Sequence, residues 1–401
     1  KTSDTSVGMY QKQPNKGPKH MKFQLKPTSA ALILAGVALA FGQTASADVT
    51  VKIGSAAPLT GAIAHIGQDQ ADGAQLAVNE INKAGNLVIG GQKVILQLDS
   101  QDDAADPKTG TQVAQKLVDD GVVAVVGHLN SGVSIPASKI YSDNGVVQIT
   151  PASTNPQYTL QGYKTTFRVI GTDAQQGPAL AKYAQKLGIK KVAIVDDATA
   201  YGQGLADEYA KTAKAEGIQV VSRDATNDKA TDFKAILTKI KAERPDAIFY
   251  GGMDATGGPF AKQAQQLAIK ARIMSGDGVC TPDLSKLAGN ATDGIICSIA
   301  GGDLSKMAGG AQFAKDLKAA FGHDPVVYSP SSYDAVHVIV DAMKRSNSIT
   351  RAGILAAMPK TNYNGLTGNI QFDEHGDLKG ASISLYKYVG GKMTLLDVLK
   401  M

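Results

Sequence analysis

The sequence is poor in the residue patterns that mark metal-dependent and nucleotide-dependent proteins. Its 401 residues include no Trp, only two Cys and six His, and no two His stand at the H-x-x-H or H-E-x-x-H spacing. That spacing is typical of catalytic metal sites, and the G-x-G-x-x-G fingerprint of dinucleotide binding is also missing. We therefore expect neither a metal nor another cofactor.

A basic excess is missing from most of the chain. The formal net charge is +5, but basic residues exceed acidic ones only before residue 48, where six Lys stand against Asp4. From Asp48 onward the two kinds are equal in number. Because a polyanion is recruited by a basic field, we expect no nucleic-acid partner.

The chain also lacks an apolar run long enough to span a bilayer, which takes roughly 18 residues. The run SAALILAGVALAFG, Ser29 to Gly42, has 14 residues, and no later run is long enough. It follows the basic segment MKFQLK and precedes Ala45-Ser46-Ala47, and the three together predict a cleavable signal peptide over residues 21–47. The polar residues 1–20 start with Lys and are expected to be an extension or tag. Since no Cys follows the cleavage site, a lipid anchor is not expected, and we place the protein free in the periplasm.

The two cysteines, Cys280 and Cys297, stand 17 residues apart. An oxidising compartment favours a disulfide between them. The alternative is a pair of buried free thiols. A metal site is not expected here, because two Cys without a neighbouring His supply too few ligands.

The order of the predicted elements points to an α/β fold. Short β-branched runs alternate with longer amphipathic segments, such as residues 67–85 and 106–121, whose apolar residues recur at helical spacing. Such β-α-β-α order predicts a parallel sheet with helices on both faces. The pattern restarts after residues 167–178, so the length is best explained by two units of this kind.

Small polar residues follow the predicted strands in both units. GHLNSG (127–132) and TPAST (150–154) do so in the first, and DDATAYGQG (196–204), GGMDATGGP (251–259) and SGDGVCTP (275–282) in the second. Ligands of open α/β sheets bind beyond the carboxyl ends of the strands, so two opposed ends predict a cleft between the units. The hydroxyls and N–H groups near Ser131 and Thr154 suit a carboxylate. Taken alone, both residues could instead be helix caps or turn residues.

Nine motifs give the chain a family resemblance over nearly all of residues 48–401. They are the segment Gly54 to Gly73, DPKTGTQVAQKLVDDG, GHLNSG, PASTNP, DAQQGP, YGQGLA, FYGG, SGDG and DEHGDLKG. In order and spacing they resemble the branched-chain amino-acid-binding proteins of bacterial ABC importers, which are type I periplasmic binding proteins. The resemblance implies two Rossmann-like lobes with parallel-rich sheets, residues 48–170 plus 301–379 and residues 171–300 plus 380–401. It also implies a three-crossover hinge near Gly171, Gly301 and Lys379 that closes on the ligand.

The resemblance further implies contacts to the head group of an α-amino acid. Ser131 matches the residue that binds the carboxylate with its hydroxyl and N–H, and Thr154 matches one that touches both carboxylate and ammonium. Ala152 would offer its carbonyl to the ammonium. Asp277 stands in place of a glutamate that pairs with the ammonium, so its reach is one methylene shorter. A ligand without an ammonium would then leave Asp277 unpaired.

The side-chain pocket departs from the family pattern. Tyr201 matches a pocket tyrosine, whereas Ile66 and Met253 replace tyrosines and could equally be core residues. The family's first-lobe disulfide is absent, because Ala105 and Asn130 fill its positions. The complete set of expected ligand-binding residues is Ile66, Leu129, Asn130, Ser131, Ala152, Ser153, Thr154, Tyr201, Met253 and Asp277.

These observations predict a monomeric, non-enzymatic binding protein for a small aliphatic amino acid. Its partners would be a permease and its ATPase subunits. Two other readings stay open. A chemosensory or amide receptor would keep the cleft and change the partner. A hydrolase would need His128 to serve Ser131, but GHLNSG lacks the G-x-S-x-G elbow. Asp254 is a rival acceptor for the ammonium.

Overall fold

A computed structural model describes residues 17, 18, 20 and 48–401 of the chain. The predicted signal peptide, residues 21–47, and most of the predicted extension, residues 1–20, lie outside the described residues. Within the described part, no helix is both long enough and apolar enough to cross a membrane.

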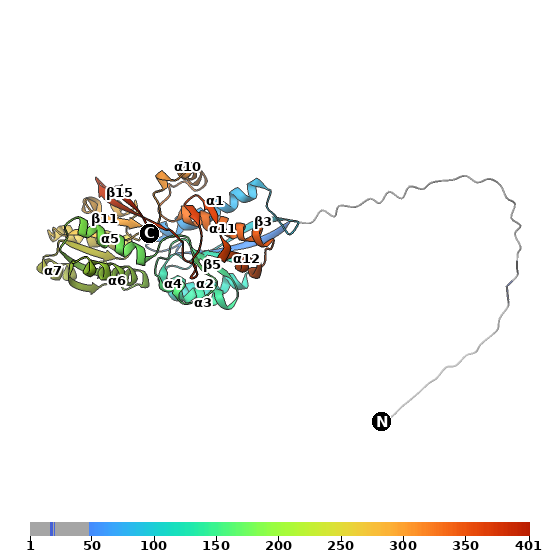
Figure 1. Cartoon of the computed structure of the whole chain (residues 1–401), viewed down its shortest axis with the longest axis horizontal. Helices are drawn as coiled ribbons and strands as arrows, with labels where there is room; N and C mark the ends of the chain where they lie inside the picture. The colour runs from blue at the N-terminus through green and yellow to red at the C-terminus, as the bar shows by residue number, and fades with distance from the viewer. Residues whose placement is uncertain (1–16, 19, 21–47) are drawn as a thin grey trace, which may run out of the picture. The chain divides into compact units, whose positions relative to one another are not determined.

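The first lobe is built on a six-stranded sheet with the order β2-β3-β1-β4-β5-β6 (Figure 1). Its strands are β1 (Val49–Ala57), β2 (Val88–Ile89), β3 (Gln92–Asp102), β4 (Ala124–Gly127), β5 (Val147–Thr150) and β6 (Thr166–Arg168). All neighbours are parallel except the β2–β3 hairpin.

Helices cover both faces of this sheet. The core on one face comes from α1 (Ala64–Ala84), α11 (Ser329–Ser346) and α12 (Arg351–Ala357), and that on the other from α2 (Pro107–Asp119) and α3 (Ser131–Asp143). α10 (Gly310–Phe321) packs on α1. The smaller elements are α4 (Gln157–Leu160), η2 (Leu304–Lys306), η3 (Met358–Lys360), β12 (Tyr363–Gly365) and β13 (Gly368–Ile370).

The second lobe holds a seven-stranded sheet with the order β15-β14-β11-β10-β9-β7-β8. β7 (Lys191–Asp196), β8 (Gln219–Ala225), β9 (Ala247–Gly251), β10 (Arg272–Ser275) and β11 (Ile296–Ile299) are parallel. β14 (Ser382–Val389) and β15 (Lys392–Lys400) form an antiparallel edge.

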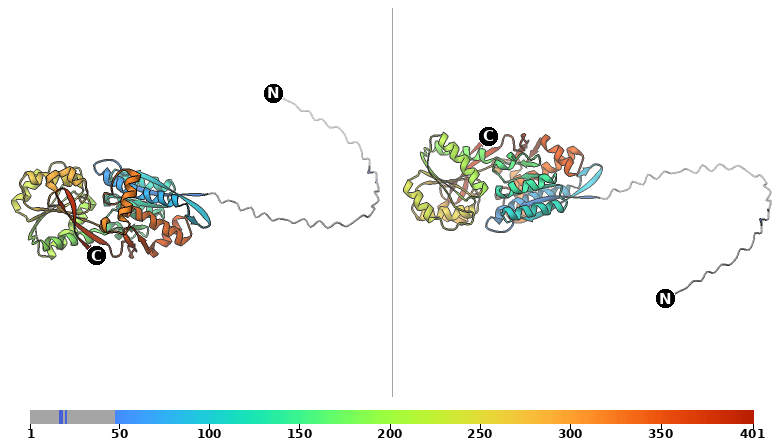
Figure 2. Two further views of the ribbon diagram at one scale, coloured as in Figure 1. Left: turned by 90° about the horizontal axis from the view of Figure 1, so that it is seen from above. Right: turned by 90° about the horizontal axis from the view of Figure 1, so that it is seen from below.

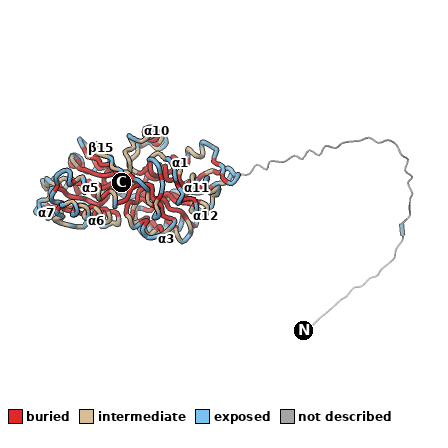
Figure 3. The backbone as a smooth tube through the Cα atoms, viewed as in Figure 1, coloured by how far each residue is buried: buried red, intermediate tan, exposed pale blue. Residues whose placement is uncertain are grey.

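The second sheet also has helices on both sides, as Figure 2 shows for each lobe. One face is covered by α5 (Asp173–Lys186) and α6 (Ala200–Ala215). The other is covered by α7 (Lys234–Glu243), α8 (Asp254–Gln266) and α9 (Leu284–Ala288), which η1 (Gly289–Thr292) follows. Buried residues, red in Figure 3, run through the interior of each lobe. The predicted fold class, two lobes with parallel-rich sheets, is confirmed.

α2 illustrates how the local sequence sets an element. The Asp106 side chain caps it by accepting the N–H of Thr109, and Pro107 occupies the first turn, where its missing N–H costs nothing. The buried stripe of the helix includes Leu117. Gly121 follows the helix with a φ of 81°, a left-handed conformation that favours glycine.

The chain passes between the sheets three times, and the three crossovers touch one another. The Gly171 N–H donates to the carbonyl of Ala300 at 2.9 Å, and the Ser384 hydroxyl donates to the carbonyl of Gly301 at 2.7 Å. A Cβ on Gly171 would lie 2.9 Å from Cδ1 of Ile383. The C-terminal third is divided between the lobes: α10 to α12 pack in the first, and β14 and β15 belong to the sheet of the second.

Candidate functional site

Two neighbouring strand ends of the first lobe bring hydroxyl groups together. β4 and β5 are adjacent and parallel, α3 begins at Ser131, and the loop of residues 151–156 follows β5. The buried Ser131 Oγ accepts a hydrogen bond from the N–H of Asn155 at 3.2 Å. The Thr154 hydroxyl is buried and has no hydrogen-bond partner. This edge can therefore offer polar groups to a small ligand.

A small cavity lies at this edge and receives residues from both lobes. Its volume is about 10 Å³, room for roughly one water molecule. Its walls are made by Leu129, Asn130, Ser131, Ala152, Tyr201, Met253 and Tyr328. Six of these seven belong to the predicted set, and Tyr328 does not. A cavity of this size cannot hold an amino acid by itself.

The other four predicted residues lie behind the cavity wall. The Ser153 hydroxyl donates to the carbonyl of Leu129 at 2.8 Å, so it braces the backbone and does not face the cavity. Ile66 is fully buried in an apolar cluster with Leu129 and Tyr328, against which Met253 packs. Thr154 and Asp277 are buried as well.

Asp277 is held by three neutral donors. Its Oδ1 accepts from Gln176 Nε2 at 3.0 Å and from the Tyr201 hydroxyl at 2.8 Å, and its Oδ2 accepts from the Tyr328 hydroxyl at 2.7 Å. Burial raises the pKa of Asp277, and these hydrogen bonds oppose the rise. Donors from two helices and a loop therefore reach Asp277. It still has no cation beside it.

Two tyrosine hydroxyls stand between the cavity and this carboxylate. Each hydroxyl has a single proton, and both protons are donated to Asp277. The Tyr201 oxygen also accepts the N–H of Gly278 at 2.9 Å. Lone pairs of both phenol oxygens therefore remain as acceptors, and the carboxylate behind them increases their negative character. This suits a cationic group in the cavity.

Sequence reasoning missed Tyr328 because a long-range contact positions it. Asp69, buried in α1, accepts the backbone N–H groups of four consecutive residues at 2.7 to 2.9 Å. They are Val326, Val327, Tyr328 and Ser329, at the start of α11. A buried Asp on the apolar face of α1 was the available signal, but it does not reveal which segment it binds.

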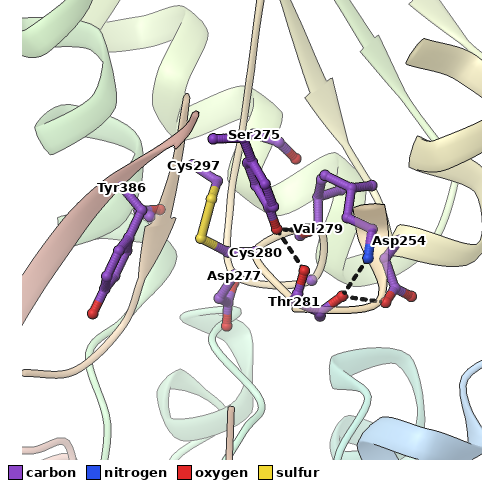
Figure 4. The surroundings of a disulfide bond; sticks show 12 residues. Asp254, Ser275, Asp277, Val279, Cys280, Thr281, Cys297 and Tyr386 are labelled. Atoms are coloured by element: carbon purple, nitrogen blue, oxygen red, sulfur yellow. Dashed lines mark hydrogen bonds between the residues drawn. A yellow bond between two sulfur atoms is a disulfide. The ribbon is translucent and has the colours of Figure 1, made fainter. Parts of the chain in front are cut away.

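The predicted disulfide between Cys280 and Cys297 is present, with the two Cα atoms 5.5 Å apart, and the free-thiol alternative is excluded (Figure 4). It ties the loop that carries Asp277 to β11. In the same loop, the Thr281 hydroxyl donates to Asp254 Oδ2. The disulfide and this hydrogen bond therefore support the loop on the acidic side of the cavity.

The rival acceptor Asp254 has another partner. His65 Nε2 of the first lobe lies 2.8 Å from Asp254 Oδ2 of the second and 3.7 Å from Asp283. The hydrogen bond with Asp254 raises the pKa of His65. Asp254 does not line the cavity. It therefore links the lobes, and Asp277 is the acid next to the cavity wall.

His128 is not arranged to activate Ser131. Its Nδ1 lies 2.7 Å from Asp103 Oδ2 and its Nε2 lies 3.1 Å from the Tyr141 hydroxyl, and all three side chains are buried. Both ring nitrogens are thus occupied, which removes the geometric basis for the hydrolase reading.

A larger cavity of about 660 Å³ adjoins the small one. It shares Asn130, Tyr201 and Met253 with the small cavity. Its other walls come from residues 60–63, 104, 105, 107, 132 and 133 of the first lobe and residues 197–200, 227–229 and 255 of the second. This is the predicted cleft, and it gives a ligand a route to the strand ends.

Comparison with known proteins identifies the family. Residues 50–391 match the periplasmic binding protein family. The chain belongs to that family. This binding protein is 39% identical to the Leu/Ile/Val-binding protein BraC3 of Rhizobium johnstonii, over 93% of its own chain and 100% of the relative. It is 36% identical to the leucine-, isoleucine-, valine-, threonine- and alanine-binding protein of Pseudomonas aeruginosa, over 90% and 94% of the two chains.

Solved structures agree. The leucine-binding protein LivK of Thermotoga maritima has a TM-score of 0.80 and 30% identity, covering 87% of this binding protein and 98% of LivK. The branched-chain amino acid transporter substrate-binding protein LivJ of Streptococcus pneumoniae, in complex with isoleucine, also gives 0.80 at 28% identity, covering 88% and 100%. The recognised resemblance is thereby confirmed.

Proposed function

We propose that this protein binds an aliphatic, branched-chain L-α-amino acid between its lobes and delivers it to the permease of an ABC importer. The observation that carries the proposal is the polarity of the cavity. Ser131, at a strand end of the first lobe, lines the cavity together with Tyr201 and Tyr328, whose hydroxyls donate to the buried carboxylate of Asp277 in the second lobe. A zwitterion needs donors at one end and acceptors at the other.

The ligand side chain would meet apolar atoms. Leu129, Met253 and the ring of Tyr328 line the cavity, and Ile66 packs behind them. An aliphatic side chain loses no hydrogen bonds there, whereas a buried polar one without a partner is penalised. The relatives whose names include leucine, isoleucine and valine support the same ligand class.

The wider setting is part of the proposal. Residues 21–47 would direct export to the periplasm, and the monomeric binding protein would meet a permease with its ATPase subunits. Hinge closure over the ligand would take place at the three crossovers, with the lobe limits predicted from the sequence. We propose no enzymatic activity, because the polar residues around the cavity are assigned to binding the charged groups of the ligand.

Isothermal titration with the standard amino acids tests the proposal. We expect leucine, isoleucine or valine to bind most tightly, and charged amino acids to bind weakly or not at all. If no amino acid binds with a dissociation constant below about 100 μM, the proposal is refuted, since that is a weak limit for a specific site. Small-angle scattering on the same samples should show compaction when the ligand is added.

A further inference from the structure

A second buried carboxyl group lies in α5 one helical turn before Gln176, which binds Asp277, and it has no role in the function described so far. Asp173, the first residue of α5, is fully buried, and neither of its side-chain oxygens has a hydrogen-bond partner. Its backbone N–H donates to the carbonyl of Thr154 at 2.9 Å. The buried hydroxyl of Thr154 is likewise without a partner. The carboxyl group of Asp173 and the hydroxyl group of Thr154 therefore both lack a hydrogen-bond partner in the same neighbourhood.

Charged groups from several neighbouring elements act on Asp173. Burial raises its pKa well above the ordinary range, and the negative charge of Asp277 raises it further. Glu208 of α6 acts in the same direction, while the Thr154 hydroxyl and Arg168 oppose it. Arg168 does not neutralise Asp173 by direct contact, because its guanidinium nitrogens bind other groups. Those are Asp377, the carbonyls of Ser153 and Asn155, and the Thr159 hydroxyl.

Two buried carboxylates without a cation are costly, and the cost is avoided when one of them is protonated. Asp277 accepts three hydrogen bonds that stabilise its charge, whereas the Asp173 side chain accepts none and has only the Thr154 hydroxyl nearby to stabilise its charge. The proton therefore belongs on Asp173. An ammonium placed between Thr154 and Asp277 would lie close to Asp173 and favour its ionised form.

We propose that Asp173 is a second acidic group of the ammonium site, which carries a proton in the unliganded protein and releases it to solvent when the ligand ammonium binds. The proposal rests on the proposed function. It deepens that function by coupling amino-acid binding to the release of a proton. Affinity then rises with pH, by up to about tenfold per pH unit for one proton released.

Titration of L-leucine in phosphate and in Tris near neutral pH tests this coupling, because released protons add the ionisation enthalpy of the buffer to the measured heat. We expect the wild type to release up to one proton more than Asp173→Asn. The variant should bind about tenfold more weakly, the size of one charge-assisted hydrogen bond. Asp334→Asn, a buried carboxylate with three donors in the first lobe, is the matched control and should keep the wild-type buffer dependence.

The decisive quantity is the difference in the number of protons released between wild type and Asp173→Asn, because closure of the lobes can also change the protonation of His65. Equal proton release by wild type and Asp173→Asn, with both binding leucine, would overturn the coupling. If leucine does not bind at all, the proposed function fails, and the infrared spectrum of the unliganded protein decides separately on Asp173. We expect a protonated carboxyl band that Asp173→Asn removes, and absence of the band in the wild type would overturn the proposal. If the variant does not fold, the infrared spectrum of the wild type still decides, because absence of a protonated carboxyl band would overturn the proposal.

Discussion

Replacement of Asp277 by asparagine removes the buried charge and keeps the shape of the side chain. The amide oxygen can still accept from Gln176 and Tyr201. The hydroxyl of Tyr328, which now donates to Oδ2 at 2.7 Å, can turn and accept from the new NH₂ group. Since each polar atom keeps a partner, we expect the urea midpoint of the unliganded protein to stay close to that of the wild type.

The affinity for an amino acid should change much more than the stability. A hydrogen bond to a charged group contributes about 1.5 to 3 kcal/mol. Loss of one such contact to the ligand ammonium therefore weakens binding by about 10- to 150-fold. Titration of L-leucine into wild type and Asp277→Asn near neutral pH measures this directly.

The matched control is Asp334→Asn. Asp334 is a buried carboxylate that accepts from the N–H groups of Leu366 and Thr367 and from the Thr367 hydroxyl, so its surroundings resemble those of Asp277. It lies in α11, away from the cavity wall. We expect an affinity close to that of the wild type. A dissociation constant for Asp277→Asn within twofold of the control would refute the placement of the ammonium.

Three further sets of substitutions test the disulfide and the contacts between the lobes. Cys280→Ser with Cys297→Ser should lower the free energy of unfolding by about 3 kcal/mol, the entropic estimate for a loop of this size, as measured by urea titration; no change would contradict the estimate. The folded-state pKa of His65 is raised, so its stabilisation relative to His65→Asn is complete below about pH 6.5 and is lost as the pH rises through that pKa. Urea titrations over a pH series check this, and a stabilisation by His65 that increases with pH would contradict it. Tyr328→Phe removes a hydrogen bond between the lobes worth about 1 kcal/mol, so scattering from the unliganded variant should indicate a more open molecule; an unchanged curve would count against the bond.

The part of the site that could be predicted from sequence follows the strand ends. Parallel strands place their carboxyl ends at one edge, so Ser131, Ala152 and Thr154 could be grouped from order alone. The disulfide was predictable for a similar reason, because two cysteines in an exported chain leave few pairings. Helix limits such as those of α2 follow from caps and glycines that act within a few residues.

The remainder depends on contacts between residues far apart in the chain. Tyr328 reaches the cavity only because Asp69, more than 250 residues earlier, binds its backbone. The donors of Asp277 come from α5, α6 and the start of α11, and no local pattern links them. The side chain of Asp277 is one methylene shorter than that of a glutamate. In the structure, the hydroxyls of Tyr201 and Tyr328 lie between its carboxylate and the cavity.

The junction of the three crossovers at Gly171 contributes to a quantity that the ligand contacts alone do not set, which is the fraction of molecules whose lobes have come together. Because Tyr328 comes from the first lobe and Asp277 from the second, the binding-competent arrangement exists only in the fraction of molecules whose lobes have come together. The apparent dissociation constant is the intrinsic one divided by that fraction. A change near Gly171 that makes this arrangement about ten times rarer would weaken binding about tenfold while every ligand contact stays the same. Affinity in this protein can therefore be tuned through populations at the hinge, independently of the specificity set by the cavity.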